Sequence, residues 1–256
     1  MKLYSKIYGI KGQSLIVIHG LFGMSDNWNT LGKRFAKYFN VHLLDLRNHG
    51  RSPYSDEFNY DVMCKDILEY MEDNNIKKTI ILGHSLGGKV AMKFAFTYPE
   101  KVEKLIIADI SPRKYDTDFV QNLLQLLYKL PLEEFEKRED IDNVLSATYE
   151  DQEIRFFLLK NLYRKQNKEF AWRFNLDVLL EKVINIQEVD FIQGVCDIPS
   201  YFLKGEKSNY ITSVDEKLIQ EHFSKVSIST IKGTGHWLHV EKPNDFYNKV
   251  ISFCLN

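Results

Sequence analysis

The sequence predicts a doubly wound α/β fold with a mostly parallel central sheet, helices on both faces and a helical insertion. Four β-rich runs are continuously apolar rather than alternating, at residues 15–18, 41–44, 79–82 and 104–108. Such runs are typical of strands covered on both faces, as in a parallel sheet. Segments with helical spacing lie between them, and alternating strands and helices favour this fold class.

The helical segments are predicted from apolar residues that recur about one turn apart. Met63, Ile67 and Met71 are spaced in this way between the second and third runs. A fifth strand is expected at residues 201–203, and a weaker one at 226–231.

The alternation of strands and helices breaks after Asp109-Ile110-Ser111-Pro112. Residues 113–196 carry mostly helical patterns, and a final helix is expected at 245–253. A helical segment inserted between two strands of an α/β sheet is naturally a lid. We therefore expect an α/β core at residues 1–112 and 197–256, with a helical cap, or lid, at 113–196.

The composition excludes several classes of protein. With 34 Lys and Arg against 35 Asp and Glu, the formal net charge is -1, which gives no argument for binding nucleic acid or an anionic membrane. No apolar run approaches the ~20 residues of a membrane-spanning helix, and the first residues lack the apolar stretch of a signal peptide. Cys64, Cys196 and Cys254 are too widely spaced for a metal cluster. We expect a cytoplasmic protein with no metal site and no integral membrane segment.

The stretch Gly83-His84-Ser85-Leu86-Gly87-Gly88 joins a predicted strand to a predicted helix. A serine between glycines at such a junction is typical of a nucleophile elbow, a sharp turn that exposes the hydroxyl at the carboxyl edge of the sheet. A plain turn serine is the alternative. We expect Ser85 to be the nucleophile.

A serine hydroxyl needs a general base. His236 follows the last predicted strand in Gly233-Thr234-Gly235-His236-Trp237, after the serine in chain order, and is the expected base. His239 is the competitor, with packing or capping as its alternative role. Asp109 ends the strand next to the elbow and is the expected acid that orients the imidazole. Glu206, in the loop after the following strand, is the alternative acid.

An oxyanion hole needs two N–H groups. One is expected from Leu86, directly after the nucleophile. The other is expected from the loop His19-Gly20-Leu21-Phe22-Gly23, which follows the first central strand. Leu21 is the favoured donor and Phe22 the alternative. Phe22, Trp172 and Trp237 are expected to line a substrate pocket under the lid, with core packing as the alternative.

Together these motifs resemble the α/β-hydrolase superfamily over nearly the whole chain. The segments Arg47-Asn48-His49-Gly50, Asp109-Ile110-Ser111-Pro112 and Gly233–His239 are similar to those of the small bacterial acyl esterases of the YbfF type and of the mitochondrial ABHD11-like hydrolases. In that group the acid follows the strand after the elbow, which implies Asp109. The stretch Trp172-Arg173-Phe174-Asn175-Leu176 in the lid is also similar.

These residues predict a serine hydrolase that cleaves carboxylic esters or thioesters of small to medium acyl groups through an acyl-enzyme. A small-molecule acyl ester would be the substrate, and no metal or organic cofactor is needed. Two alternatives remain open. One is a C–C bond hydrolase or elimination enzyme of the menaquinone-biosynthesis type, and the other is a non-catalytic ligand receptor on the same fold.

Overall fold

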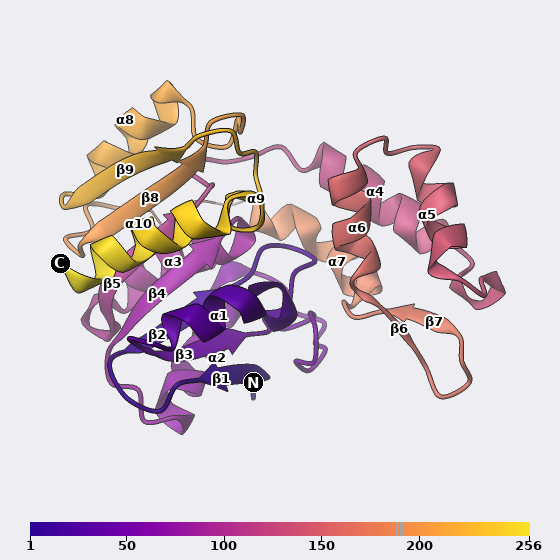
Figure 1. Cartoon of the computed structure of the whole chain (residues 1–256), viewed down its shortest axis with the longest axis horizontal. Helices are drawn as coiled ribbons and strands as arrows, with labels where there is room; N and C mark the ends of the chain where they lie inside the picture. The colour runs from indigo at the N-terminus through magenta and orange to yellow at the C-terminus, as the bar shows by residue number, and fades with distance from the viewer. Residues whose placement is uncertain (188, 190–191) are drawn as a thin grey trace.

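A seven-stranded sheet forms the centre of the molecule in the computed structural model, which describes residues 1–187, 189 and 192–256 (Figure 1). Its strand order is β1-β3-β2-β4-β5-β8-β9. The strands are β1 (Ser5–Tyr8), β2 (Ser14–Ile18), β3 (Asn40–Leu44), β4 (Thr79–His84), β5 (Val102–Ala108), β8 (Ser200–Gly205) and β9 (Val226–Ile231). β1 runs antiparallel to β3, and the other neighbouring strands are parallel.

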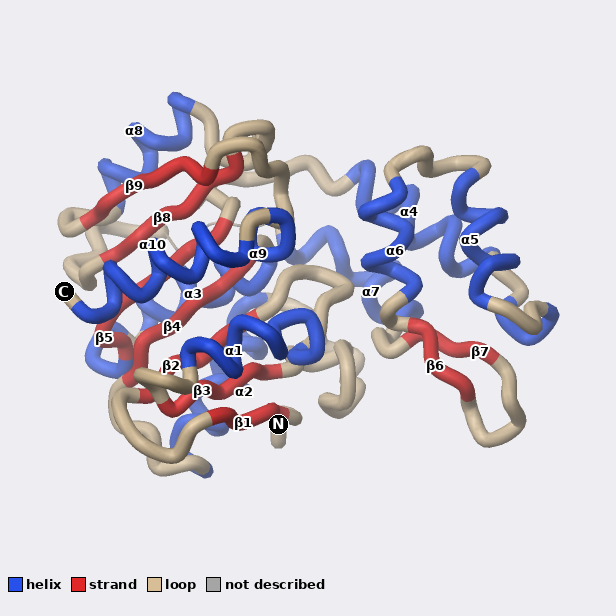
Figure 2. The backbone as a smooth tube through the Cα atoms, in the orientation of Figure 1, coloured by secondary structure: helices blue, strands red, loops and turns tan. Residues whose placement is uncertain are grey.

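Helices cover both faces of this sheet (Figure 2). One face packs against α1 (Asn29–Phe35), α9 (Leu238–Glu241) and α10 (Pro243–Leu255). The other packs against α2 (Tyr60–Asp73), α3 (Leu86–Thr97) and α8 (Ser213–His222). The short 3-10 helices are η1 (Ser25–Trp28), η2 (Pro99–Lys101), η3 (Leu132–Glu134) and η4 (Val183–Ile186). This layering confirms the predicted α/β fold.

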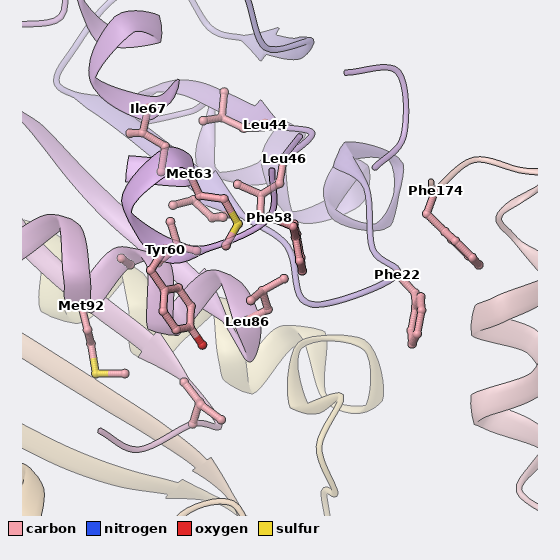
Figure 3. Packing of buried hydrophobic residues seen from close by; sticks show 14 of the residues in the cluster. Phe22, Leu44, Leu46, Phe58, Tyr60, Met63, Ile67, Leu86, Met92 and Phe174 are labelled. Atoms are coloured by element: carbon pink, nitrogen blue, oxygen red, sulfur yellow. The ribbon is translucent and has the colours of Figure 1, made fainter. Parts of the chain in front are cut away.

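The unbroken apolar runs follow from this two-sided burial. Along β2, Leu15 and Val17 join the core beneath α1 and α10. Ile16 and Ile18 join the core beneath α2 and α3. All four side chains are buried, so no position on the strand is left for a polar residue. Figure 3 shows the second of these layers, where Met63 of α2 lies near other buried apolar side chains.

The segment between β5 and β8 lies to the right of the sheet in Figure 1. We call residues 113–196 the lid. It contains α4 (Asp118–Lys129), α5 (Arg138–Ser146), α6 (Gln152–Leu159) and α7 (Leu176–Lys182). It also contains an antiparallel hairpin, β6 (Leu162–Arg164) and β7 (Phe170–Trp172), where the sequence predicted mostly helix. Strands of three residues are too short to produce a recognisable alternation.

Specific contacts hold the lid on the core. The Phe22 and Phe174 rings lie 5.1 Å apart, and Figure 3 shows these two side chains side by side. The Asn161 amide donates a hydrogen bond to the Phe22 carbonyl oxygen (2.8 Å). The backbone N–H of Asn175 donates to the Asn48 carbonyl oxygen (2.9 Å). The lid therefore bears directly on the loop expected to supply the oxyanion hole.

Candidate active site

Ser85 occupies a strained turn between β4 and α3. Its φ of 52° and ψ of -119° lie in a region that non-glycine residues rarely adopt. The turn is tight because its neighbours have no side chains: a Cβ on Gly83 would lie 2.2 Å from the Gly87 carbonyl oxygen, and one on Gly87 would lie 2.4 Å from the Ile18 carbonyl oxygen. The Ser85 N–H donates to the Ala108 carbonyl oxygen at 3.1 Å, which ties the turn to the end of β5.

His236 and Asp109 are joined by a hydrogen bond. The His236 Nδ1–H donates to Asp109 Oδ2 at 2.8 Å. Asp109 directly follows β5, is fully buried, and also has a positive φ of 50°. Tyr210 stacks on the His236 imidazole with ring centroids 4.0 Å apart. The imidazole is therefore fixed in orientation from its edge and from its face.

Two further donors hold the Asp109 carboxylate. The Gly205 N–H donates to Oδ1 at 3.0 Å, and the Ser208 hydroxyl donates to Oδ2. These hydrogen bonds fix the orientation of the carboxylate toward the imidazole. Ser208 was not among the predicted site residues. Its position after β8, at the same sheet edge as Asp109, is the signal that could have found it.

Glu206, the alternative acid, contacts the backbone of the histidine loop instead of the imidazole. Its Oε2 accepts a hydrogen bond from the Gly233 N–H at 2.8 Å. The same loop is held by Glu241, whose Oε2 accepts from the Gly235 N–H at 2.8 Å. Both glutamates therefore help to position the loop that carries His236.

His239, the alternative base, is a packing residue. It is buried and stacks on Trp28 with ring centroids 4.2 Å apart and an interplanar angle of 3°. Burial lowers the pKa of His239 to about 3, so its imidazole is neutral. His84 precedes the nucleophile but donates from Nε2 to the His236 carbonyl oxygen at 2.9 Å, which fixes the backbone of the histidine loop.

The loop from Gly20 to Gly23 lies against the nucleophile. A Cβ on Gly20 would lie 3.2 Å from the Ser85 Cβ, so a side chain here would crowd the serine. The loop is closed by a hydrogen bond from the Gly23 N–H to the Gly20 carbonyl oxygen at 2.9 Å. Phe22 has a φ of 60°. Across the site, Leu86 is the first residue of α3, where backbone N–H groups have no intrahelical acceptor.

A cavity of about 300 Å³ opens beside Ser85. Four of the predicted oxyanion and pocket residues line it together with Ser85 and His236, and all four come from the core: Leu21, Phe22, Leu86 and Trp237.

Trp172 has a different place from the one expected. It does not line this cavity in the part of the chain that the structure describes. It ends β7, is buried, and stacks on Phe174 with ring centroids 5.3 Å apart. The alternative of core packing therefore holds for Trp172, because its indole is buried against Phe174, which in turn contacts Phe22.

The lid supplies much of the remaining cavity wall. These residues are mostly apolar, and sequence reasoning did not single them out as pocket residues: Tyr115, Thr117, Phe119, Val120, Leu123, Ile154, Phe157, Leu158 and Ile186. A mostly apolar concave space next to a polar reactive group is typical of a small-molecule site.

Comparison with known proteins identifies the family. A family model described as the alpha/beta hydrolase fold matches residues 13–243. The chain belongs to the α/β-hydrolase family. A putative esterase/lipase of Haemophilus influenzae is 36% identical over 242 residues, which cover 94% of this chain and 83% of the relative. An sn-1-specific diacylglycerol lipase ABHD11 of Danio rerio is 34% identical over 96% of this chain and 80% of its own length.

A solved structure of a marine microorganism esterase is also similar to this α/β-hydrolase. The two chains share 40% sequence identity with a TM-score of 0.94, over 98% of this chain and 99% of the other. The Escherichia coli esterase YbfF is 28% identical over 90% of this chain and 88% of its own length. These similarities confirm the resemblance inferred from the motifs.

Lys89 is a charged group on the cavity wall of this α/β-hydrolase. Its side chain is buried, and its ammonium donates to the Arg113 carbonyl oxygen and lies 5.1 Å from the centre of the Tyr115 ring. Burial, followed by the positive charge of Arg113, lowers the pKa of Lys89 to about 7. Sequence reasoning assigned no role to Lys89.

Two further kinds of site are absent from the residues that the structure describes. No group of three or more His, Cys, Asp or Glu side chains among them could hold a metal ion. No helix within the described part of the chain is long and apolar enough to cross a membrane.

Proposed function

We propose that this α/β-hydrolase is a serine hydrolase that cleaves carboxylic esters or thioesters of small to medium acyl groups through an acyl-enzyme. The observation that carries the proposal is the arrangement around the cavity. Ser85 and His236 both line it, and His236 is hydrogen-bonded to the buried Asp109 carboxylate. The printed names of similar proteins, an esterase/lipase and a marine esterase, support the same reaction class.

In the first half of the reaction, His236 accepts the proton of the Ser85 hydroxyl as its oxygen attacks the carbonyl carbon of the substrate. Asp109 keeps the Nδ1–H of the imidazole pointed away from the serine and stabilises the imidazolium that forms. The carbonyl oxygen gains negative charge, and the backbone N–H groups of Leu21 and Leu86 would stabilise it.

The tetrahedral intermediate then collapses. The bond between the acyl carbon and the leaving oxygen or sulfur breaks, and His236 gives its new proton to that leaving atom. Water next attacks the acyl-enzyme with His236 again as base, which releases the carboxylic acid and restores Ser85. The cavity of about 300 Å³ would hold the acyl group during both halves.

The cysteines support a cytoplasmic location for this reaction. Cys64, Cys196 and Cys254 are all buried free thiols. Free thiols are typical of a reducing compartment, since oxidising compartments favour disulfides.

The test is covalent labelling combined with turnover. A fluorophosphonate probe should label the wild type but not Ser85→Ala, and only the wild type should hydrolyse p-nitrophenyl esters of short and medium acids. Ser146→Ala, at an exposed serine of α5, is the matched control and should behave as the wild type. Equal labelling of the wild type and Ser85→Ala, or no hydrolysis of any ester by the wild type, would remove the proposal.

A further inference from the structure

The loop between β8 and α8, residues 206–212, contacts the acid and the base of the candidate site at the same time. The hydroxyl of Ser208 donates a hydrogen bond to Asp109 Oδ2. The ring of Tyr210, which lines the cavity, stacks on the His236 imidazole. The proposed mechanism uses the acid and the base but leaves this stacked ring without a part.

Tyr210 meets the imidazole face to face. The two ring centroids lie 4.0 Å apart, and the planes differ by 20°. The π face of an aromatic ring carries partial negative charge, and a cation within about 6 Å of the centroid over that face is attracted to it. The ring can therefore favour an imidazolium over a neutral imidazole, which an aliphatic side chain in the same place could not do.

Asp109 is the carboxylate that compensates the positive charge His236 acquires, through the hydrogen bond to Nδ1 at 2.8 Å. The other two histidines close to this imidazole carry no charge. Burial lowers the pKa of His84 well below its ordinary value and that of His239 to about 3. Most of the cavity wall is apolar, so water screens charges there less than it does in solution. An aromatic face next to the imidazolium consequently has more effect than it would on an open surface.

Tyr210 is tied to the same network as the acid. Its backbone N–H donates to Ser208 Oγ at 3.2 Å, and the Ser208 hydroxyl in turn donates to Asp109. The Asp109 carboxylate accepts from His236 as well. The ring, the acid and the base therefore belong to one hydrogen-bonded unit, which keeps the ring in place before charge develops.

The hydroxyl group of Tyr210 is not required for this effect. Burial, followed by the negative charge of Asp109, raises the pKa of Tyr210, so the phenol stays protonated and the side chain is uncharged. The attraction for a cation then belongs to the π face, which a phenylalanine would supply as well.

We propose that Tyr210 is a positioning residue that stabilises the imidazolium form of His236 through the face of its ring. The proposal rests on the serine hydrolase function proposed above. The base becomes positively charged as each tetrahedral intermediate forms, in acylation and again in deacylation. An interaction made with the charged form alone accelerates the chemical steps and contributes little to substrate binding.

The first experiment measures kcat and KM for p-nitrophenyl acetate, whose short acyl group gains little from the cavity wall. Tyr210→Leu removes the π face, so kcat should fall about tenfold, equivalent to about 1.4 kcal/mol, while KM stays within about twofold. Tyr210→Phe should restore most of that loss. Tyr128→Leu is the matched control, because Tyr128 is an exposed residue of α4 that does not border the cavity, and it should behave as the wild type.

The second experiment keeps the shape of the ring nearly constant and changes the charge on its face. Tyr210→Phe is compared with forms of the same variant that carry one, two or three fluorine atoms on the ring. Each fluorine withdraws electron density and weakens the attraction for a cation. We expect kcat to fall with every added fluorine, to about fivefold below Tyr210→Phe in the trifluorinated form, with KM unchanged. This series decides the matter even if Tyr210→Leu does not fold.

Equal losses of kcat in Tyr210→Leu and Tyr210→Phe, or a constant kcat across the fluorinated series, would overturn the proposal and leave Tyr210 as a residue of the cavity wall. The serine hydrolase function would stand in that case, provided that a fluorophosphonate probe still labels the wild type and not Ser85→Ala. If the wild type is neither labelled nor active on p-nitrophenyl acetate, the underlying function fails first.

Discussion

The core and the lid contribute different kinds of residue to the candidate site. Ser85, Asp109 and His236 all lie in loops or turns at strand ends of the core, and each is tied to other core groups by hydrogen bonds. The lid contributes side chains such as Phe119 and Phe157, which form part of the cavity wall through apolar surface. The core therefore carries the proposed chemistry, and the lid shapes what can reach it.

This division has a physical reason. Reacting groups must be held to within a fraction of an ångström, which rigid strand ends and networks of hydrogen bonds can provide. The backbone strain at Ser85 and Asp109, with φ values of 52° and 50°, persists only where the surroundings fix the chain on all sides. Apolar walls need only shape and volume, so the lid can change its side chains without disturbing the strand ends.

The largest expected effect comes from the buried acid of the core. Asp109→Asn keeps the shape of the side chain but removes the charge that stabilises the imidazolium, so kcat for a p-nitrophenyl ester should fall by about 10⁴-fold. Glu206→Gln is the matched control. It weakens a contact to the Gly233 N–H and should cost at most about tenfold, or about 1.4 kcal/mol.

Circular dichroism must show that Asp109→Asn remains folded, because the carboxylate also accepts hydrogen bonds from Gly205 and Ser208. If the folded variant keeps its activity while Glu206→Gln loses it, the acid belongs to the loop after β8. The division between the two regions would survive, but the assignment within the core would change.

The buried histidines of the core should give the next largest effect. All seven histidines of the chain lie outside the lid. Burial lowers the pKa of His19 to about 4 and that of His49 and His239 to about 3. In the unfolded chain these imidazoles take up protons near pH 6.5, so the unfolded state binds more protons below that pH. The contribution of these neutral histidines to the free energy of unfolding is therefore fully present above about pH 6.5 and is lost as the pH falls below it.

Each of these histidines should lower the free energy of unfolding by about 1.4 kcal/mol for every pH unit below about 6.5. The three together should therefore lower it by about 4 kcal/mol at about pH 5.5. Urea unfolding at about pH 7.5 and 5.5 measures the loss. His239→Phe should retain the stacking on Trp28 and reduce the loss at about pH 5.5 by the share of one histidine, about 1.4 kcal/mol. An unchanged pH dependence in this variant would show that its imidazole does not drive the acid sensitivity.

The core was also the more predictable region. The run at 79–82 lies within β4 (Thr79–His84), and the weaker run at 226–231 coincides with β9. Two-sided burial produces long apolar runs, which are visible in one sequence. β1 (Ser5–Tyr8) was missed because it is an edge strand, and all four of its residues are half-buried or exposed.

Within the candidate site, too, the core residues were more predictable from the sequence than the lid residues. Motif spacing predicted Ser85, Asp109 and His236 because backbone geometry restricts which residues can occupy an elbow and the ends of neighbouring strands. The hydrogen bond from Ser208 depends on how one loop folds back across the sheet edge, and no spacing rule encodes that. The inward position of Phe119 and the different place of Trp172 depend on the tertiary packing of the lid helices and hairpin, which the apolar pattern alone does not specify.

The smallest expected effect is a change in selectivity from one phenylalanine of the lid. Phe119 borders the cavity beside Ser85, whereas Phe156, also in the lid, does not. They are a matched pair because their side chains are 50% and 49% exposed, so truncation of either to alanine should cost little stability. Phe119→Ala should raise KM for the longer members of an acyl series about fivefold, equivalent to about 1 kcal/mol of lost apolar contact, with little change for acetate esters.

Phe156→Ala is the matched control, because Phe156 is equally exposed but does not border the cavity. It should leave KM for the whole acyl series nearly unchanged. In Phe119→Ala kcat should change less than KM, because this side chain is placed to contact the acyl chain and not the reacting atoms, so only uniform binding is lost. A large fall in kcat for short substrates in either variant would mean that the lid also positions the reacting groups. The separation of chemistry in the core from selectivity in the lid would then have to be abandoned.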